Sequence, residues 1–322
     1  MKNIFIFLNL LIITNYTTAQ TDSEHKNSID QSKSIYSNIE YTFKIEKAQK
    51  LIAGLMTEKN IPGLSIAIGT KNEIVWAQGF GFADLENKTP VKINSKFRIG
   101  SISKTLTALA LGKLIENGQI SLSDIVQNYV HYFPEKKYPV TIEQLASHSA
   151  GIRDYNYSTG EYLSSKNYET VQESISIFKD DTLLFEPGTK YSYSTYGYVL
   201  LSAVIESAAN TNFLEFMRDS IFTPLNLNNT LPDFNYEIIE NRVRFYDEVK
   251  GKIANGYYVN NSNKWAGGGY LSTPYDLVLM SQSFLKNQFL SEQTIQRLWT
   301  PYQLSNGEKP TMESDGGRTM TV

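Results

Sequence analysis

Two short apolar segments separated by a turn constrain the fold of this chain more than any other feature of its sequence. Residues 63–69 (GLSIAIG) and 73–79 (EIVWAQG) read as strands, and the Thr-Lys-Asn at 70–72 suits a hairpin turn. An isolated hairpin is only marginally stable in water, so it needs further strands or a covering helix. Residues 45–56 carry apolar side chains at helical spacing and predict such a helix.

The chain from residue 101 to about residue 285 is predicted to be mostly helical with long loops. Thr141 opens a capping box (Thr-Ile-Glu-Gln) before an apolar run, and Thr273 precedes a proline at the first position of another helix. An antiparallel hairpin next to a large helical region favours the α+β class. The two strands alone make an incomplete sheet.

Composition excludes several classes of function. The net charge of −3 gives no indication of nucleic acid or an anionic membrane surface as a partner. Cysteine is absent, which excludes disulfides, thiolate metal sites and a cysteine nucleophile. The chain has no His-Glu-x-x-His or other metal-ligand spacing, and it lacks the Gly-x-Ser-x-Gly turn of α/β-hydrolases. We therefore expect neither a metal nor a cofactor.

The first residues have the pattern of a secretory signal peptide. Lys2 precedes an apolar stretch at residues 4–13, and Thr-Thr-Ala ending at Ala19 resembles a cleavage site. An uncleaved membrane anchor is the alternative, but the apolar stretch is shorter than the roughly 20 residues that span a bilayer. We expect an exported protein, periplasmic or secreted. The expected order is a signal peptide (1–19), a polar linker (20–40) and a single folded domain (41–322).

A Ser-x-x-Lys motif is the strongest sign of chemistry. Serine and lysine three residues apart share one face of a helix, and the helix N-terminus favours developing negative charge. The serine can attack a carbonyl while the lysine takes its proton. Only one of the three matches has a glycine just before it and an apolar helix after it, and this is Ser101–Lys104. The other two are Ser23–Lys26 and Ser283–Lys286.

Four ordered segments extend this signal into a resemblance to a family. Residues 97–108 resemble the Ser-x-x-Lys segment of the β-lactamase-related serine hydrolases, which include class C β-lactamases, D-alanyl-D-alanine carboxypeptidases and esterases. Residues 142–152, 187–198 and 266–277 are similar to further segments of that family. The resemblance implies a penicillin-binding-protein-like fold, with an antiparallel sheet and a large helical subdomain. It implies Ser101 as the nucleophile and Lys104 as its base.

By the same resemblance, Tyr193 is the tyrosine that relays a proton between the serine, the lysine and the leaving group. A neighbouring lysine ammonium is expected to lower the pKa of its phenol. Thr195 stands where the family usually has asparagine and is a candidate for substrate binding through its hydroxyl. Tyr-Ser-Thr also resembles a branch related to mitochondrial lactamase-like proteases. His148 lies in a motif-like segment, where we expect a packing or capping role.

The family's third motif is missing from its expected place. No Lys-Thr-Gly or His-x-Gly follows residue 277, and residues 316–322 are only a faint candidate. We therefore expect the chain to stop before the family's later strands and C-terminal helix, which would leave it weakly active and marginally folded.

Two functions from different classes stay open. The first is an enzyme that acylates Ser101 with an amide or ester, such as a D-alanyl peptide, a β-lactam, a simple ester or a short peptide. The second is a non-catalytic module that binds such ligands, or an inactive remnant. The expected partner is a small molecule or peptide, and the sequence does not indicate an oligomeric state.

Overall fold

Strand β3 is the centre of the N-terminal sheet, and the predicted hairpin forms the main part of that sheet. In the computed structural model, which describes residues 29–309, 311–313 and 319–321, β2 (Gly63–Gly69) pairs antiparallel with β3 (Ile74–Asp84). The register places Ile66 opposite Gln78. The turn between the strands lies where the sequence predicts it, and β3 extends beyond its predicted end.

Strand β1 (Ile35–Ser37) pairs with the other edge of β3 and corrects the predicted linker over residues 20–40. Its pairing depends on backbone N–H and C=O groups, which even a polar segment carries. The predicted linker is therefore too long at its C-terminal end. A short strand, β4 (Thr89–Pro90), pairs with the far end of β3, so the sheet has more than the two predicted strands and the order β1-β3-β2.

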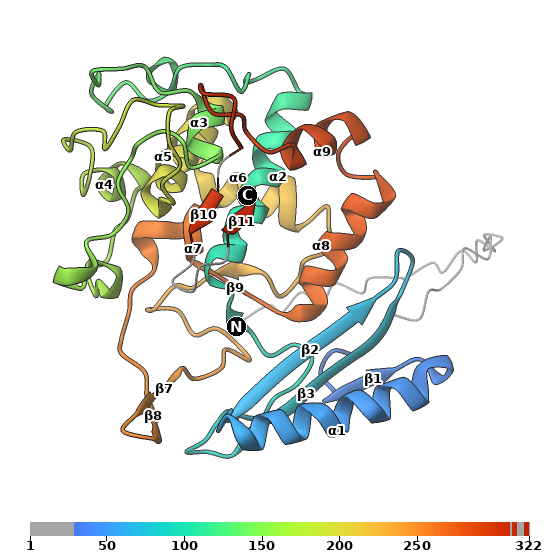
Figure 1. Ribbon diagram of the computed structural model, residues 1–322. Coiled ribbons are helices and arrows are strands. Elements are labelled where there is room, and N and C mark those ends of the chain that lie inside the picture. The colour runs from blue at the N-terminus through green and yellow to red at the C-terminus, as the bar shows by residue number, and fades with distance from the viewer. Residues whose placement is uncertain (1–28, 310, 314–318, 322) are drawn as a thin grey trace, which may run out of the picture. The chain divides into compact units, whose positions relative to one another are not determined.

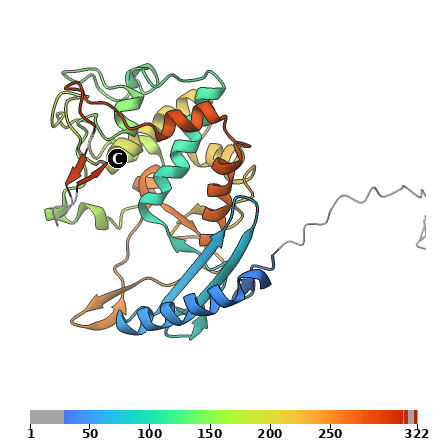
Figure 2. The ribbon, with the colours of Figure 1, turned by 45° about the vertical axis from the view of Figure 1, so that its right-hand side comes forward.

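Helices cover both faces of this sheet (Figure 1). α1 (Thr42–Glu58) lies along one face, where Gln49 donates a hydrogen bond to Gln78 at 2.8 Å. α8 (Pro274–Lys286) packs on the other face, as a second view also shows (Figure 2). Close approach is possible because Gly69 has no side chain; a Cβ atom there would lie 2.5 Å from Val278. We refer to residues 31–92 as the sheet layer.

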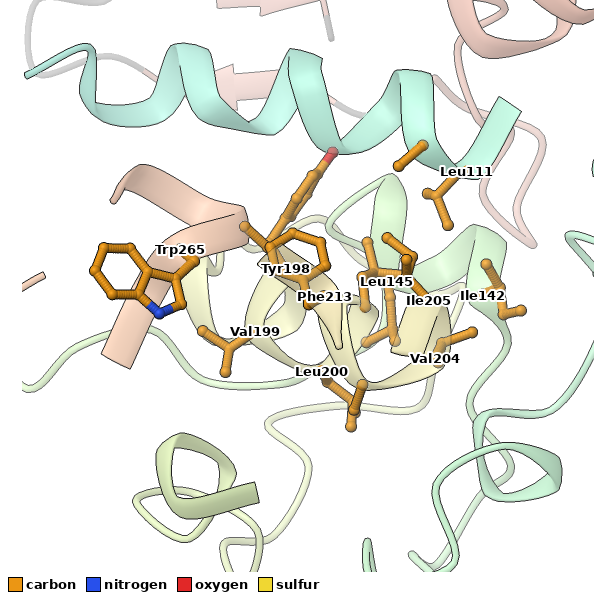
Figure 3. Close-up of a cluster of buried hydrophobic side chains, with 14 of the residues drawn as sticks. Leu111, Ile142, Leu145, Tyr198, Val199, Leu200, Val204, Ile205, Phe213 and Trp265 are labelled. Carbon is orange, nitrogen blue, oxygen red and sulfur yellow. The ribbon is translucent and has the colours of Figure 1, made fainter. Parts of the chain in front are cut away.

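The helical body, residues 100–230 and 261–299, packs around α5 (Thr195–Ala209). Every residue of α5 from 195 to 205 is buried. Figure 3 shows part of this core, where side chains of α5 such as Leu200 and Ile205 cluster with Leu145 and Phe213. The neighbouring helices α2 and α3 span Ser103–Glu116 and Ile142–Ala146.

Strand β5, an edge of a small antiparallel sheet in the order β5-β9-β6, lies just before Ser101 in the chain. Arg98 on β5 donates to the fully buried carboxylate of Asp233, with Nε 2.6 Å from Oδ2. Because a buried charge is costly unless it is paired, this bond helps to fix the strand that leads to Ser101. The strands are β5 (Phe97–Arg98), β6 (Leu231–Pro232) and β9 (Tyr270–Ser272).

The architecture confirms the predicted α+β class, with an antiparallel sheet and a large helical subdomain. The predicted signal peptide (1–19) and part of the faint third-motif candidate (316–322) lie outside the described residues. Among the residues described, no helix is both long enough and apolar enough to cross a membrane. The remaining elements are α4 (Val171–Ile175), α6 (Phe213–Met217), α7 (Trp265–Gly268), α9 (Glu292–Trp299), β7 (Tyr246–Val249), β8 (Lys252–Asn255), β10 (Thr311–Glu313) and β11 (Thr319–Thr321).

Candidate active site

Ser101 lies on a tight turn that leads directly into α2. Residues Gly100–Ile102 form a 3-10 turn, and Gly100 has a φ of +50°, a left-handed conformation that glycine adopts without strain. Lys104 follows in the first turn of α2, and its Nζ donates a hydrogen bond to Ser101 Oγ at 3.4 Å. Ser101 is exposed and Lys104 is buried, so a substrate can reach the serine while the lysine is shielded from water.

Tyr193 reaches the same serine from a distant part of the chain. It lies in the loop before α5, next to the N-cap residue Ser194. Its phenol donates a hydrogen bond to Ser101 Oγ at 2.7 Å, and Lys104 Nζ lies 4.7 Å from the centre of its ring. The structure therefore brings together the three residues that the sequence singles out as a nucleophile, a base and a proton relay.

Two further groups surround the Lys104 ammonium. Its Nζ donates to the backbone oxygen of Gly267 in α7 at 2.7 Å and to Thr195 Oγ1 at 3.5 Å. Gly267 allows this close packing because a Cβ atom there would lie only 2.5 Å from Thr195 Cγ2. Thr195 is itself buried and contacts Lys104. Its role in binding substrate stays a prediction.

Burial changes the acid–base properties of Lys104. Loss of water lowers the pKa of its ammonium from 10.5 to about 8, although the charge of Asp154 raises the pKa in opposition. A lysine with this pKa is partly neutral slightly above pH 7. It can therefore accept a proton from Ser101, which an ordinary lysine ammonium cannot do.

The structure corrects the expectation that the pKa of Tyr193 is lowered. Burial of the phenol raises its pKa, and this effect outweighs the hydrogen bond with Ser101, which lowers it. The sequence argument considered the neighbouring lysine but not the loss of water around a phenolate. Tyr193 is therefore suited to donate a proton at neutral pH, whereas the lowered pKa of Lys104 suits its amine to accept one.

His148 lies beneath the tyrosine. Its ring centre is 4.4 Å from that of Tyr193, and its Nδ1 accepts a hydrogen bond from the backbone N–H of Ser194 at 3.2 Å. Burial, together with the nearby charge of Lys104, lowers the pKa of His148 to about 3, so the ring is neutral at pH 7. Its contacts are those of a residue that supports the Tyr193 loop, as expected from the sequence.

Sequence reasoning missed Asp154, whose charge acts on Lys104. It lies two positions beyond the recognised segment 142–152, and no motif marks it. In the part of the chain that the structure describes, no three His, Cys, Asp or Glu side chains are grouped as a metal site requires.

The fold and the grouping of serine, lysine and tyrosine define the class of penicillin-binding proteins and β-lactamases. The family model described as Beta-lactamase matches residues 48–318. The chain thus belongs to this family of β-lactamase-related serine hydrolases.

Named relatives agree with this assignment. The chain is 32% identical to the human mitochondrial serine beta-lactamase-like protein LACTB over 80% of its own length, and 29% identical to penicillin-binding protein 4* of Bacillus subtilis over 73%. It spans 62% and 55% of those two proteins. Among solved structures, the octameric penicillin-binding protein homologue from Pyrococcus abyssi has a TM-score of 0.71 at 27% identity, covering 85% of this chain and 66% of that one. The hydrolase EstCE1 has a TM-score of 0.73 at 20% identity, covering 85% and 81%, which shows a shared fold.

Proposed function

We propose that this protein is a serine hydrolase that forms an acyl-enzyme on Ser101 with an amide or ester substrate. One observation carries the proposal: Ser101 Oγ lies 2.7 Å from the Tyr193 hydroxyl and 3.4 Å from Lys104 Nζ. An exposed nucleophile is thus within hydrogen-bond distance of a proton donor and, at 3.4 Å, of a base. Family membership supports the reaction class. The amide or ester substrate is part of the proposal.

The proposed reaction has two halves. In the first, Ser101 Oγ bonds to the carbonyl carbon and its proton passes to the neutral amine of Lys104. The carbon–nitrogen or carbon–oxygen bond then breaks, and the leaving group takes the proton of Tyr193 and departs as an amine or alcohol. The Lys104 ammonium gives the proton it received from Ser101 to the tyrosinate. In the second, a water molecule gives a proton to the same base and attacks the ester on Ser101. The bond between the carbonyl carbon and Ser101 Oγ breaks, Oγ takes the proton that Lys104 received from the water, and the carboxylic acid leaves.

We also propose that the chain is exported. The basic residue, apolar stretch and small-residue site at positions 2–19 support a cleaved signal peptide. The relative LACTB is described as mitochondrial, so export is proposed from the N-terminal sequence alone. The N-terminal sequence of protein recovered outside the cytoplasm tests this proposal, with Gln20 expected as the first residue and Met1 contradicting it.

Variants of the lysine and the tyrosine test the chemistry. Lys104→Ala and Tyr193→Phe should each lower the rate of p-nitrophenyl ester hydrolysis by about 10² to 10⁴, the usual worth of general acid–base catalysis. Lys113→Ala on the same helix and Tyr191→Phe in the same loop are matched controls and should keep the wild-type rate. The proposal fails if Lys104→Ala and Tyr193→Phe hydrolyse the ester as fast as their controls.

A further inference from the structure

Asp154 lies behind the site and makes contacts through both carboxylate oxygens. Its Oδ1 accepts a hydrogen bond from the backbone N–H of Thr195 at 2.9 Å, and its Oδ2 accepts one from the Tyr157 hydroxyl at 3.1 Å. Thr195 is the first residue of α5, where backbone N–H groups have no partner within the helix. A carboxylate here also interacts favourably with the positive end of the helix dipole. Asp154 therefore holds the start of α5.

The chain leading to Asp154 also binds the residue that follows Tyr193. Ser194 donates its backbone N–H to His148 Nδ1 at 3.2 Å and its hydroxyl to the backbone oxygen of Arg153 at 2.8 Å. With the bond from Asp154 to the next residue, these contacts fix two consecutive positions directly after the tyrosine. The direction of the Tyr193 side chain toward the serine depends on them.

Asp154 is close to the base as well as to the tyrosine. It binds the N–H of Thr195, whose Oγ1 lies 3.5 Å from Lys104 Nζ. Among the described residues, its carboxylate is the group whose charge opposes the effect of burial on Lys104. The other titratable side chains that face Lys104 are neutral at pH 7: His148, Tyr193 and Tyr198.

We propose that Asp154 is a positioning residue for the serine site, an inference that rests on the proposed function. It anchors the start of α5 next to Tyr193, and its negative charge keeps Lys104 protonated up to a higher pH than burial alone would allow. Asp154 therefore raises the pH above which the amine of Lys104 is available to Ser101, against the larger effect of burial.

Three variants separate the effect of the Asp154 charge from the effect of its hydrogen bond to Thr195. Asp154→Asn removes the charge but keeps an oxygen that can accept the N–H of Thr195. Asp154→Ala removes both. Asp181→Asn is the matched control, because Asp181 is one of the carboxylates bound to the neighbouring Arg153 and is not among the groups that shift the pKa of Lys104.

The titration of Lys104 tests the charge directly and does not require activity. In the NMR spectrum of protein labelled with ¹³Cε-lysine, the Lys104 signal is identified as the one missing from the spectrum of Lys104→Met. Its midpoint is expected near pH 8 in the wild type and in Asp181→Asn. Both Asp154→Asn and Asp154→Ala should lower it by about half a pH unit or more. Equal midpoints in the wild type and both Asp154 variants would overturn the inference.

Lys264 is a second lysine that responds to Asp154, and its pKa is also lowered to about 8, mainly by burial. Assigning the NMR signal of Lys264 with Lys264→Met distinguishes its titration from that of Lys104.

Ester hydrolysis then tests both roles of Asp154. The acid limb of the pH profile should move to lower pH in Asp154→Asn, because the charge is lost. Asp154→Ala should in addition lose about tenfold or more in kcat on the plateau, because Tyr193 is displaced.

The two proposals fail in different ways. If Lys104 titrates as expected but the wild type hydrolyses no ester, the proposed function is wrong and the effect of Asp154 on the lysine stands. If the wild type is active and Asp154→Ala matches Asp154→Asn on the plateau, the anchoring role is wrong.

Discussion

Helices α5 and α1 have similar lengths and opposite surroundings. α5, in the helical body, has 15 residues, and all those from 195 to 205 are buried. α1, on the sheet layer, has 17 residues, of which only Ile45 is buried. A helix such as α5 is held in place by side chains packed around it on all sides. A helix such as α1 is held only by the contacts of one face.

The sheet layer also leaves apolar groups uncovered. On α1, Phe43 is 80% exposed and Leu51 is 67% exposed. Within the described residues, β2 pairs on one edge only, with β3. Ser101, Lys104 and Tyr193 all belong to the helical body. This comparison indicates that packing in the helical body determines the geometry of the site, and that the sheet layer contributes less to it.

The largest expected effect of a substitution is in the body. Leu200 on α5 is completely buried in the cluster of Figure 3. Leu200→Ala should lower the free energy of unfolding by about 2 to 5 kcal/mol, because it removes apolar contacts and leaves a cavity. Chemical denaturation measures this loss. A loss below about 1 kcal/mol would mean that the body is less tightly packed than the structure indicates.

Burial of Lys104 in the body should make stability depend on pH. Because its pKa is about 8 in the folded state and 10.5 as a reference value, the unfolded chain binds more protons between these two pH values. Stability contributed by this group therefore rises with pH through that window and is lowest below pH 8. Compared with Lys104→Met, the wild type should gain about 2 to 3 kcal/mol from pH 8 to pH 10.5. A difference that stays constant with pH would contradict the buried position of the ammonium.

The smallest expected effect is on α1. Leu51→Ala, chemically identical to the change at Leu200, should alter the free energy of unfolding by less than about 0.5 kcal/mol, because Leu51 is 67% exposed. Denaturation under the same conditions makes the pair directly comparable. A loss above about 2 kcal/mol would show that this face of α1 is covered in solution.

Features that depend on neighbouring residues were predictable from the sequence. The hairpin at residues 63–79, the capping box at Thr141 and the proline helix start at Thr273 all form as expected. Ser101 and Lys104 are three positions apart, so their shared helix face follows from helix geometry. Tyr193 required a motif, because its contact with Ser101 spans 92 positions.

Features that depend on backbone pairing or on burial were not predictable. β1 has only three residues, and its pairing with β3 has no side-chain signature. Gly267 lies in the family-like segment 266–277, but the resemblance does not give its contact with Lys104 across 163 positions. Asp154 binds Thr195 across 41 positions, and no motif marks Asp154. The raised pKa of Tyr193 follows from burial, which a list of neighbouring residues does not reveal.

Covalent labelling of Ser101 tests the central claim most directly. The folded wild-type protein is treated with a fluorophosphonate probe, and its mass and peptide map are compared with those of Ser101→Ala. Ser283→Ala, which alters another Ser-x-x-Lys match, is the control. We predict one adduct per chain, located on Ser101, kept in Ser283→Ala and lost in Ser101→Ala. An adduct on a different serine, or a folded wild-type protein that takes up no label, would contradict the account.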